Sequence, residues 1–114
     1  MKPEDILAVH PRIRFVGLAT RKGQVIFGQM RPGVVSHHKE PSRTAGLELQ
    51  GPYVIEMAEK KYWAGPLEHV AMTFEKYVQL FIPLKNHIAE ITIERDVPPE
   101  MYSKICSAIR DLEK

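Results

Sequence analysis

The sequence lacks the features that mark secreted and membrane proteins. It contains a single cysteine, Cys106, so no internal disulfide can form, which agrees with a reducing compartment. No apolar run approaches the roughly 18 residues that a membrane-spanning helix needs. The first residues, Met-Lys-Pro-Glu-Asp-Ile-Leu, lack the apolar core of a signal peptide. These absences predict a cytoplasmic protein that does not insert into membranes.

Motifs for nucleotide or metal binding are also missing. The glycines between Gly28 and Gly33 follow neither Gly-x-Gly-x-x-Gly nor Gly-Lys-Ser/Thr, so a phosphate cradle is not indicated. The pair His37-His38 with nearby Glu40 could belong to a metal site, but adjacent residues seldom both reach one ion. A solvated pair of loop histidines is the simpler interpretation. The sequence therefore predicts no metal and no cofactor.

Two further groups could carry chemistry, and each has a structural interpretation. Glu90 and Glu94, on either side of Thr92, could form an acid/base pair, but the solvated or helix-covered rim of a sheet explains them more simply. Cys106 falls on the apolar side of the last predicted helix without a histidine and a basic residue to activate it, which indicates a buried structural thiol. We therefore predict no catalytic residue. An enzyme would need polar residues that meet in a cleft.

Length and composition indicate one globular domain, residues 1–114, with 44% hydrophobic residues and a net charge of +2. The charge is uneven, because residues 1–45 hold eight Lys and Arg against three acids. Such asymmetry can steer an acidic partner toward one part of a protein. No interleaving of aromatic and basic residues accompanies it, so nucleic-acid binding is not predicted.

The strongest pattern is an antiparallel meander between Val70 and Glu94. Three β-rich pieces are separated by the polar turns Glu75-Lys76 and Lys85-Asn86. Alternate residues of each piece are apolar, so one face of the sheet must be covered by helices. Pro83 cannot donate to the ladder, and its nitrogen must face a bulge or an unpaired position.

A hairpin and two short helices are predicted around this meander. Ile13–Thr20 and Gln24–Met30 are strands joined at Arg21-Lys22-Gly23, and apolar residues on both faces of the first strand indicate a central position. A short helix begins near Pro3, and a last helix begins near Pro99 with Asp96 as a possible cap. With a helix between the hairpin and the meander, the order of elements is α-β-β-α-β-β-β-α.

The middle helix, predicted from Thr44 to Trp63, has two apolar stripes. One stripe is Leu47, Gly51, Val54, Ala58 and Tyr62, and the other is Leu49, Tyr53 and Met57. Two stripes on one helix indicate burial against its own sheet and against a second surface. Gly51-Pro52 predicts a kink or a break, since proline inside a helix removes a hydrogen bond and clashes one turn back.

The element order and two stretches resemble the Roadblock/dynein light chain family, a profilin-like α/β fold. The stretches are Phe15–Ile26 and Val78–Ile91, and the resemblance covers nearly the whole chain. More closely, Ile13–Gly17 and Gly28–Gly33 look like those of small uncharacterised archaeal proteins of this fold. The resemblance implies a five-stranded antiparallel sheet in the order 2-1-5-4-3, with the first and last helices on one face and the middle helix on the other.

The resemblance also implies a non-catalytic homodimer that scaffolds complexes or binds and regulates a small Ras-like GTPase. Family members dimerise through the middle helix and the third strand, and the doubly apolar middle helix agrees with this. Gly51-Pro52 departs from the family pattern within that helix. The residues that we expect at the interface are Leu49, Tyr53, Met57, Trp63, Val70 and Met72. The alternative is a small-ligand sensor, which would need an apolar cavity between sheet and helix.

Overall fold

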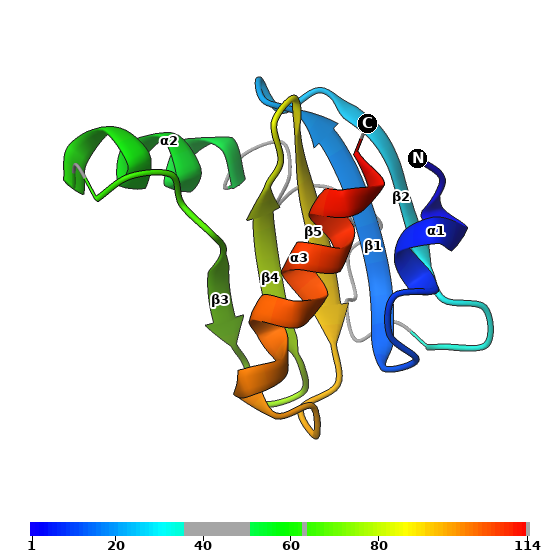
Figure 1. Cartoon of the computed structure of the whole chain (residues 1–114). Helices are drawn as coiled ribbons and strands as arrows, with labels where there is room; N and C mark the ends of the chain where they lie inside the picture. The colour runs from blue at the N-terminus through cyan, green and yellow to red at the C-terminus, as the bar shows by residue number, and fades with distance from the viewer. Residues whose placement is uncertain (36–50, 63, 114) are drawn as a thin grey trace.

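The chain forms an α+β fold in which helices cover both faces of an antiparallel sheet (Figure 1). The structure is a computed structural model that describes residues 1–35, 51–62 and 64–113. The helices and strands follow one another as α1 (Pro3–Leu7), β1 (Ile13–Thr20), β2 (Val25–Met30), α2 (Gly51–Tyr62), β3 (Val70–Thr73), β4 (Val78–Pro83), β5 (His87–Ile93), the 3-10 turn η2 (Pro99–Met101) and α3 (Tyr102–Leu112). The predicted order of elements is confirmed.

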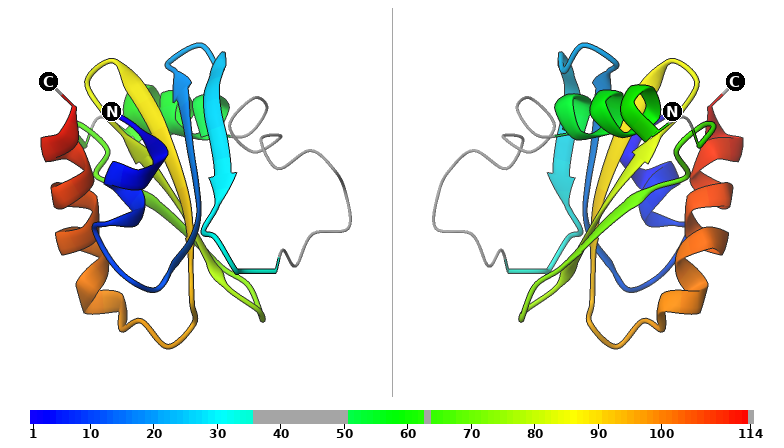
Figure 2. Two further views of the ribbon diagram at one scale, coloured as in Figure 1. Left: turned by 90° about the vertical axis from the view of Figure 1, so that its right-hand side faces the viewer. Right: turned by 90° about the vertical axis from the view of Figure 1, so that its left-hand side faces the viewer.

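The five strands lie in the order β2-β1-β5-β4-β3, and all neighbours are antiparallel. The order that the resemblance implied is thus confirmed. β1 lies between β2 and β5, as its apolar residues on both faces predicted. β2 and β3 are the edge strands. α1 and α3 lie on one face of the sheet and α2 lies on the other (Figure 2).

The core is divided into two unequal clusters by the sheet. The larger cluster fills the space under α1 and α3, with buried side chains from both helices and from β1, β4 and β5. The smaller cluster lies on the α2 face, and its fully covered members are Ala19, Ile55, Phe81 and Ile88. Most of the apolar stabilisation of the fold therefore comes from the α1/α3 side.

α1 is too short to be stable alone and is held by contacts with the rest of the domain. Ile6 and Leu7 are buried in the larger cluster. Arg31, just beyond β2, donates hydrogen bonds to the carbonyl oxygens of Leu7 (2.6 Å), His10 (2.8 Å) and Ile13 (2.6 Å). One guanidinium thus joins the end of α1, the following turn and the start of β1.

Of two local predictions, the helix cap at Asp96 is wrong and the unpaired position of the Pro83 nitrogen is confirmed. Asp96 does not cap the last helix but forms an ion pair with Arg12 (2.9 Å). Pro83 is the last residue of β4, and β3 begins opposite Phe81, so the proline nitrogen lies beyond the β3 ladder. In the part of the chain that the structure describes, no helix is long and apolar enough to cross a membrane.

Candidate protein-interaction surface

The outer face of α2 exposes large apolar side chains. Ile55 is the buried anchor of the helix, with 1% of its surface exposed, and it packs in the smaller cluster. At about 100° per residue, Tyr53 and Met57 project on the side of the helix opposite Ile55. They are 65% and 41% exposed, and Val54 beside them is 37% exposed. Apolar exposure of this extent on one helix face is typical of an interaction surface.

The prediction for the inner stripe of this helix is wrong at Val54, and the side chains of Leu47 and Tyr62 lie outside the described residues. The sequence pattern places Val54 on the stripe that faces the sheet, but Val54 is exposed, and Ile55 takes that role. Between residues 51 and 61 of this helix, Gly51 and Ile55 are the buried residues. Pro52 lies within the described helix, and the predicted half from Thr44 to Gln50 lies outside the described residues.

Polar residues continue the outer face of α2 toward its C-terminal end. A groove of about 370 Å³ there is lined by Tyr53, Glu56, Met57, Lys60 and Lys61. Glu56 and Lys60 are one turn apart and form an ion pair of 2.6 Å. Their hydrogen bond lowers the pKa of Glu56 and raises the pKa of Lys60. The helix thus presents aromatic and thioether groups next to fixed charges.

The free edge of β3 lies on the same side of the molecule as α2 (Figure 1). The Phe74 N–H donates to the Tyr77 carbonyl oxygen (2.8 Å), which makes these two residues a hydrogen-bonded pair at the β3–β4 turn. Hydrogen-bonded pairs alternate along an antiparallel ladder, so Met72 and Val70 also point their backbone groups toward β4. Ala71 and Thr73 therefore turn their N–H and C=O groups outward, and within the described ranges no strand lies beyond them.

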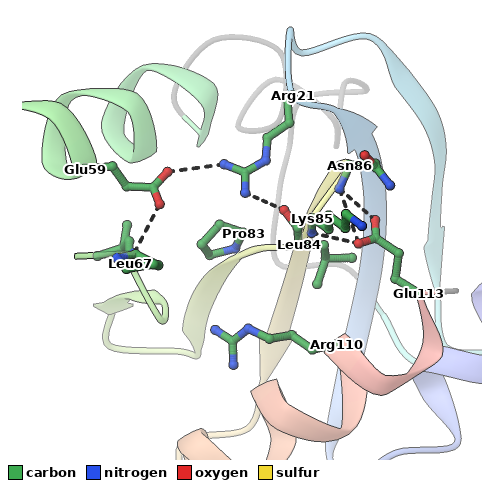
Figure 3. Close-up of a pocket in the computed structure, with 10 residues that line it drawn as sticks. Arg21, Glu59, Leu67, Pro83, Leu84, Lys85, Asn86, Arg110 and Glu113 are labelled. Carbon is green, nitrogen blue, oxygen red and sulfur yellow. Dashed lines mark hydrogen bonds and ion pairs between the residues drawn. The ribbon is translucent and has the colours of Figure 1, made fainter.

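Ion pairs and hydrogen bonds hold α2 and the segment before β3 against the domain (Figure 3). Arg21, at the β1–β2 turn, forms an ion pair with Glu59 of α2 (3.2 Å) and donates to the carbonyl oxygen of Leu84. The other oxygen of Glu59 accepts a hydrogen bond from the Leu67 N–H (3.2 Å). α2, the end of β4 and the approach to β3 are thereby connected through two side chains.

Glu68 connects the same segment to α3. Its carboxylate accepts a hydrogen bond from the Ser103 hydroxyl (2.6 Å), which lowers the pKa of Glu68. Arg110 donates to the Glu68 carbonyl oxygen, and the rings of His69 and Tyr102 meet edge to face at 6.4 Å. β3 is therefore positioned by contacts on both faces of the sheet.

The predicted interface residues fall into three groups. Tyr53 and Met57 are exposed on the outer face of α2. Val70 and Met72 are half-buried and pack against the smaller cluster, so they support α2 as well as the β3 edge. Leu49 and Trp63 lie outside the described residues, as do His37, His38 and Glu40.

Sequence reasoning missed several residues that build this surface. Ile55 could have been found, because it lies about 200° around the helix from Tyr53. The outward backbone N–H and C=O groups of Ala71 and Thr73 could not have been found, because they follow from which residue pairs of β3 and β4 are hydrogen-bonded. The ion pair of Arg21 with Glu59 joins residues 38 positions apart, and no local pattern indicates it.

A second hollow, of about 430 Å³, lies between the C-terminal ends of α2 and α3 and the β4–β5 turn (Figure 3). Its charged groups come from Arg21, Glu59, Lys85, Arg110 and Glu113. Both carboxylates are engaged, that of Glu59 as described above and that of Glu113 with the N–H of Lys85 (2.7 Å). The lining is thus polar, with one ion pair between Arg21 and Glu59 and with the Glu113 carboxylate bound by backbone N–H groups.

Other candidate groups for chemistry are held in structural contacts. Cys106 is fully buried, and burial raises the pKa of its thiol to about 11, as expected of a structural cysteine. Glu90 is buried on the α2 face and accepts a hydrogen bond from the Gln79 amide. Glu94 forms an ion pair with Arg14 (2.5 Å). Among residues 1–35, 51–62 and 64–113, no three metal-ligating side chains gather into a site.

The sequence matches no protein-family model and no curated protein sequence. The structure, in contrast, is similar to solved structures. The gliding protein MglB from Thermus thermophilus is 13% identical, with a TM-score of 0.66 over 96% of this chain and 83% of that chain. A Roadblock/LC7 domain from Streptomyces avermitilis is 7% identical, with a TM-score of 0.68 over 95% and 88%. MglB in a tetrameric arrangement is 13% identical, with a TM-score of 0.67 over 96% and 82%. The chain therefore has the Roadblock/LC7 fold.

Proposed function

We propose that the protein is a non-catalytic interaction module that forms a homodimer through α2 and β3. One observation carries this proposal. The outer face of α2 exposes Tyr53, Val54 and Met57 on the same side of the molecule as the unpaired edge of β3. A second copy would cover this apolar face and would also pair the strand edge, which is otherwise a template for association with other chains.

The alternation of hydrogen-bonded pairs along β3 predicts how the β3 strands of two copies pair. Within β3, the outward backbone groups belong to Ala71 and Thr73, so an antiparallel pair of β3 strands uses both when Ala71 lies opposite the partner's Thr73. This register places Met72 opposite the partner's Met72 on the twofold axis. Such a pair is not hydrogen-bonded, and its Cα atoms are about 4.5 Å apart. The axis is perpendicular to the sheet, so both α2 helices lie on the same face.

Cysteine cross-linking tests this arrangement. A Cα separation of about 4.5 Å lies within the range that a disulfide bridges. We expect Met72→Cys to form a covalent dimer under mild oxidation, on a non-reducing gel. Ala71→Cys and Thr73→Cys are the matched controls and should stay uncross-linked, because each residue is offset from its own copy. The buried Cys106 should give no background, since its thiol is inaccessible.

Sedimentation measures the dimer itself. We expect wild type to sediment as a dimer at high micromolar concentration, and Tyr53→Glu to sediment as a monomer because it places a charge in the apolar contact. A wild-type monomer would contradict the proposed dimer. If wild type is a dimer but Ala71→Cys or Thr73→Cys cross-links instead of Met72→Cys, the dimer stands and only its register is rejected.

The partner that we propose for this dimer is a protein, of which a small Ras-like GTPase is the specific candidate. The family resemblance supports this choice, and the fold shared with MglB and the Roadblock/LC7 domain agrees with it. Pull-down from native extract with immobilised dimer, in the presence of either GTP or GDP, tests it by mass spectrometry. Recovery of a GTPase that depends on the nucleotide supports the proposal. If only proteins other than a GTPase are recovered, the proposed GTPase partner is contradicted.

The small-ligand alternative receives less support. A sensor would hold its ligand in an apolar cavity between sheet and helix. The side chains under α1 and α3 form one closely packed apolar cluster. The hollow beside the β4–β5 turn is instead lined by Arg21, Glu59, Arg110 and Glu113, whose charges largely balance.

A further inference from the structure

A second groove lies on the other face of the sheet, between α1 and the C-terminal end of α3. Its volume is about 590 Å³, larger than that of the hollow in Figure 3. The groove is lined by Met1, Asp5, Leu18, Ile26, His87, Asp111, Leu112 and Glu113. α1 and α3 cover the face opposite α2 (Figure 2), and none of the residues that line this groove belongs to α2 or β3.

The side-chain charge of this groove is mostly negative, and Met1 adds its α-amino group to the lining. Three of the described lining residues are carboxylates, namely Asp5, Asp111 and Glu113, and none of the described lining residues is Lys or Arg. The chain as a whole carries a net charge of +2, so this local excess of acid runs against the average. A cluster of negative potential in a concave site attracts cationic groups.

Two of the three carboxylates are fixed by backbone groups. Asp5 accepts a hydrogen bond from the Lys2 N–H at the start of α1 (2.8 Å). Glu113 accepts one from the Lys85 N–H (2.7 Å) and contacts the ring of His87 (2.6 Å). Among the described residues, Asp111 has no hydrogen bond or ion pair, and it is exposed. Its carboxylate is therefore available to a ligand.

The groove also has an apolar floor. Leu18 of β1 and Ile26 of β2 both line the groove, and they are 3% and 51% exposed. Leu112, from the last turn of α3, is half-buried at the side. An exposed isoleucine beside a leucine gives a contact for one apolar side chain, with the carboxylate of Asp111 on the rim.

We propose that this groove binds a segment of another protein in which Lys or Arg side chains flank an apolar side chain. The apolar side chain would cover Ile26 and Leu18, and a cation beside it would pair with Asp111. The negative lining disfavours nucleic acids and acidic peptides, because like charges would be brought together. The proposal does not depend on the dimer, since the groove is made within one subunit.

Fluorescence anisotropy with synthetic peptides tests this. The probe is a short labelled peptide of alternating arginine and leucine, compared with peptides of the same length that alternate glutamate and leucine or arginine and serine. We expect only the arginine–leucine peptide to bind wild type well, and its binding to weaken as sodium chloride is raised. Asp111→Lys should lower its association constant about tenfold. Ile26→Ser should lower it several-fold, because it removes the apolar floor.

The matched control is Glu100→Lys, which makes the same charge change at an exposed site near the other end of α3. It should change the association constant by about twofold or less. Circular dichroism melting checks that each variant is folded. Three outcomes would each overturn the proposal. The first is that the glutamate–leucine peptide binds as well as the arginine–leucine peptide, and the second is that Glu100→Lys weakens binding as much as Asp111→Lys. The third outcome is that wild type binds no peptide at millimolar concentration.

Discussion

At the scale of single residues, Arg31 connects three backbone segments. Its three hydrogen bonds go to carbonyl oxygens at the end of α1, in the following turn and in β1. These carbonyls lie where the short helix meets the sheet, and a helix of five residues has few bonds of its own. The guanidinium therefore supplies hydrogen bonds that hold this short helix against the sheet.

Replacing Arg31 should destabilise the fold. We expect Arg31→Ala to lower the free energy of unfolding by about 2–3 kcal/mol, because charged hydrogen bonds to partly buried carbonyls are lost. Arg31→Lys should recover only part of this, since one ammonium cannot match the planar fork of donors. Urea unfolding measures both. Arg95→Ala is the control, since Arg95 is exposed and donates only to the β3–β4 turn, and its effect should stay below about 1 kcal/mol.

Glu113 makes stability depend on pH. Burial alone would raise the pKa of its carboxyl, but hydrogen bonds from His87 and from the N–H groups of Asn86 and Lys85 lower it overall. A carboxyl with a lowered pKa in the folded state contributes stability above its unfolded value. That contribution is lost as the pH falls through the folded value.

Glu113→Gln should therefore cost more stability near neutral pH than in acid. We expect the difference in free energy of unfolding between wild type and the variant to be largest at about pH 7 and to shrink toward about pH 3. Urea titrations at a series of pH values measure it. Glu4→Gln, an exposed change on α1, should show no such trend. A difference for Glu113→Gln that is constant across the range would contradict the linkage.

At the scale of elements, the described part of α2 buries fewer side chains than α3. Its buried side chain, Ile55, meets only a small cluster, whereas α3 buries Ile105, Cys106 and Ile109 in the larger one. The polar contact of Glu59 with Arg21 adds a partly exposed ion pair, which contributes little by itself. The exposed apolar face thus belongs to a helix that contacts the sheet through few buried side chains.

Ile55→Ala should loosen α2 without unfolding the sheet. Removing the buried side chain is expected to cost about 2–4 kcal/mol, concentrated in the smaller cluster. Hydrogen exchange should show faster exchange of the α2 amides while β1 and β5 keep their protection. Val54→Ala removes apolar atoms from the exposed side of the same helix and should leave exchange nearly unchanged. Equal loss of protection in α2 and β1 would show that the two layers unfold together.

At the scale of the whole molecule, the element order could be predicted from local patterns. Alternation of apolar residues marked the strands, and polar turns such as Lys85-Asn86 marked their ends. The order of the strands in the sheet required the family resemblance, since periodicity does not say which strands are neighbours. That order is confirmed.

The surface was less predictable than the fold. Tyr53 and Met57 were found because a helix with two apolar stripes must hide one of them elsewhere. The acidic groove was missed, because Asp5 and Asp111 are 106 positions apart and meet only through the packing of α1 and α3. Sites that depend on such distant pairs leave no local signal in a sequence.

The unequal division of the core has an evolutionary consequence. The α2 layer contributes less to the stability of the fold than the α1/α3 layer does. Substitutions in α2 are therefore tolerated more easily during evolution. New binding preferences can then arise on α2 while the sheet beneath it is inherited unchanged. Homologues with this division of the core can therefore gain new binding partners through substitutions in one helix.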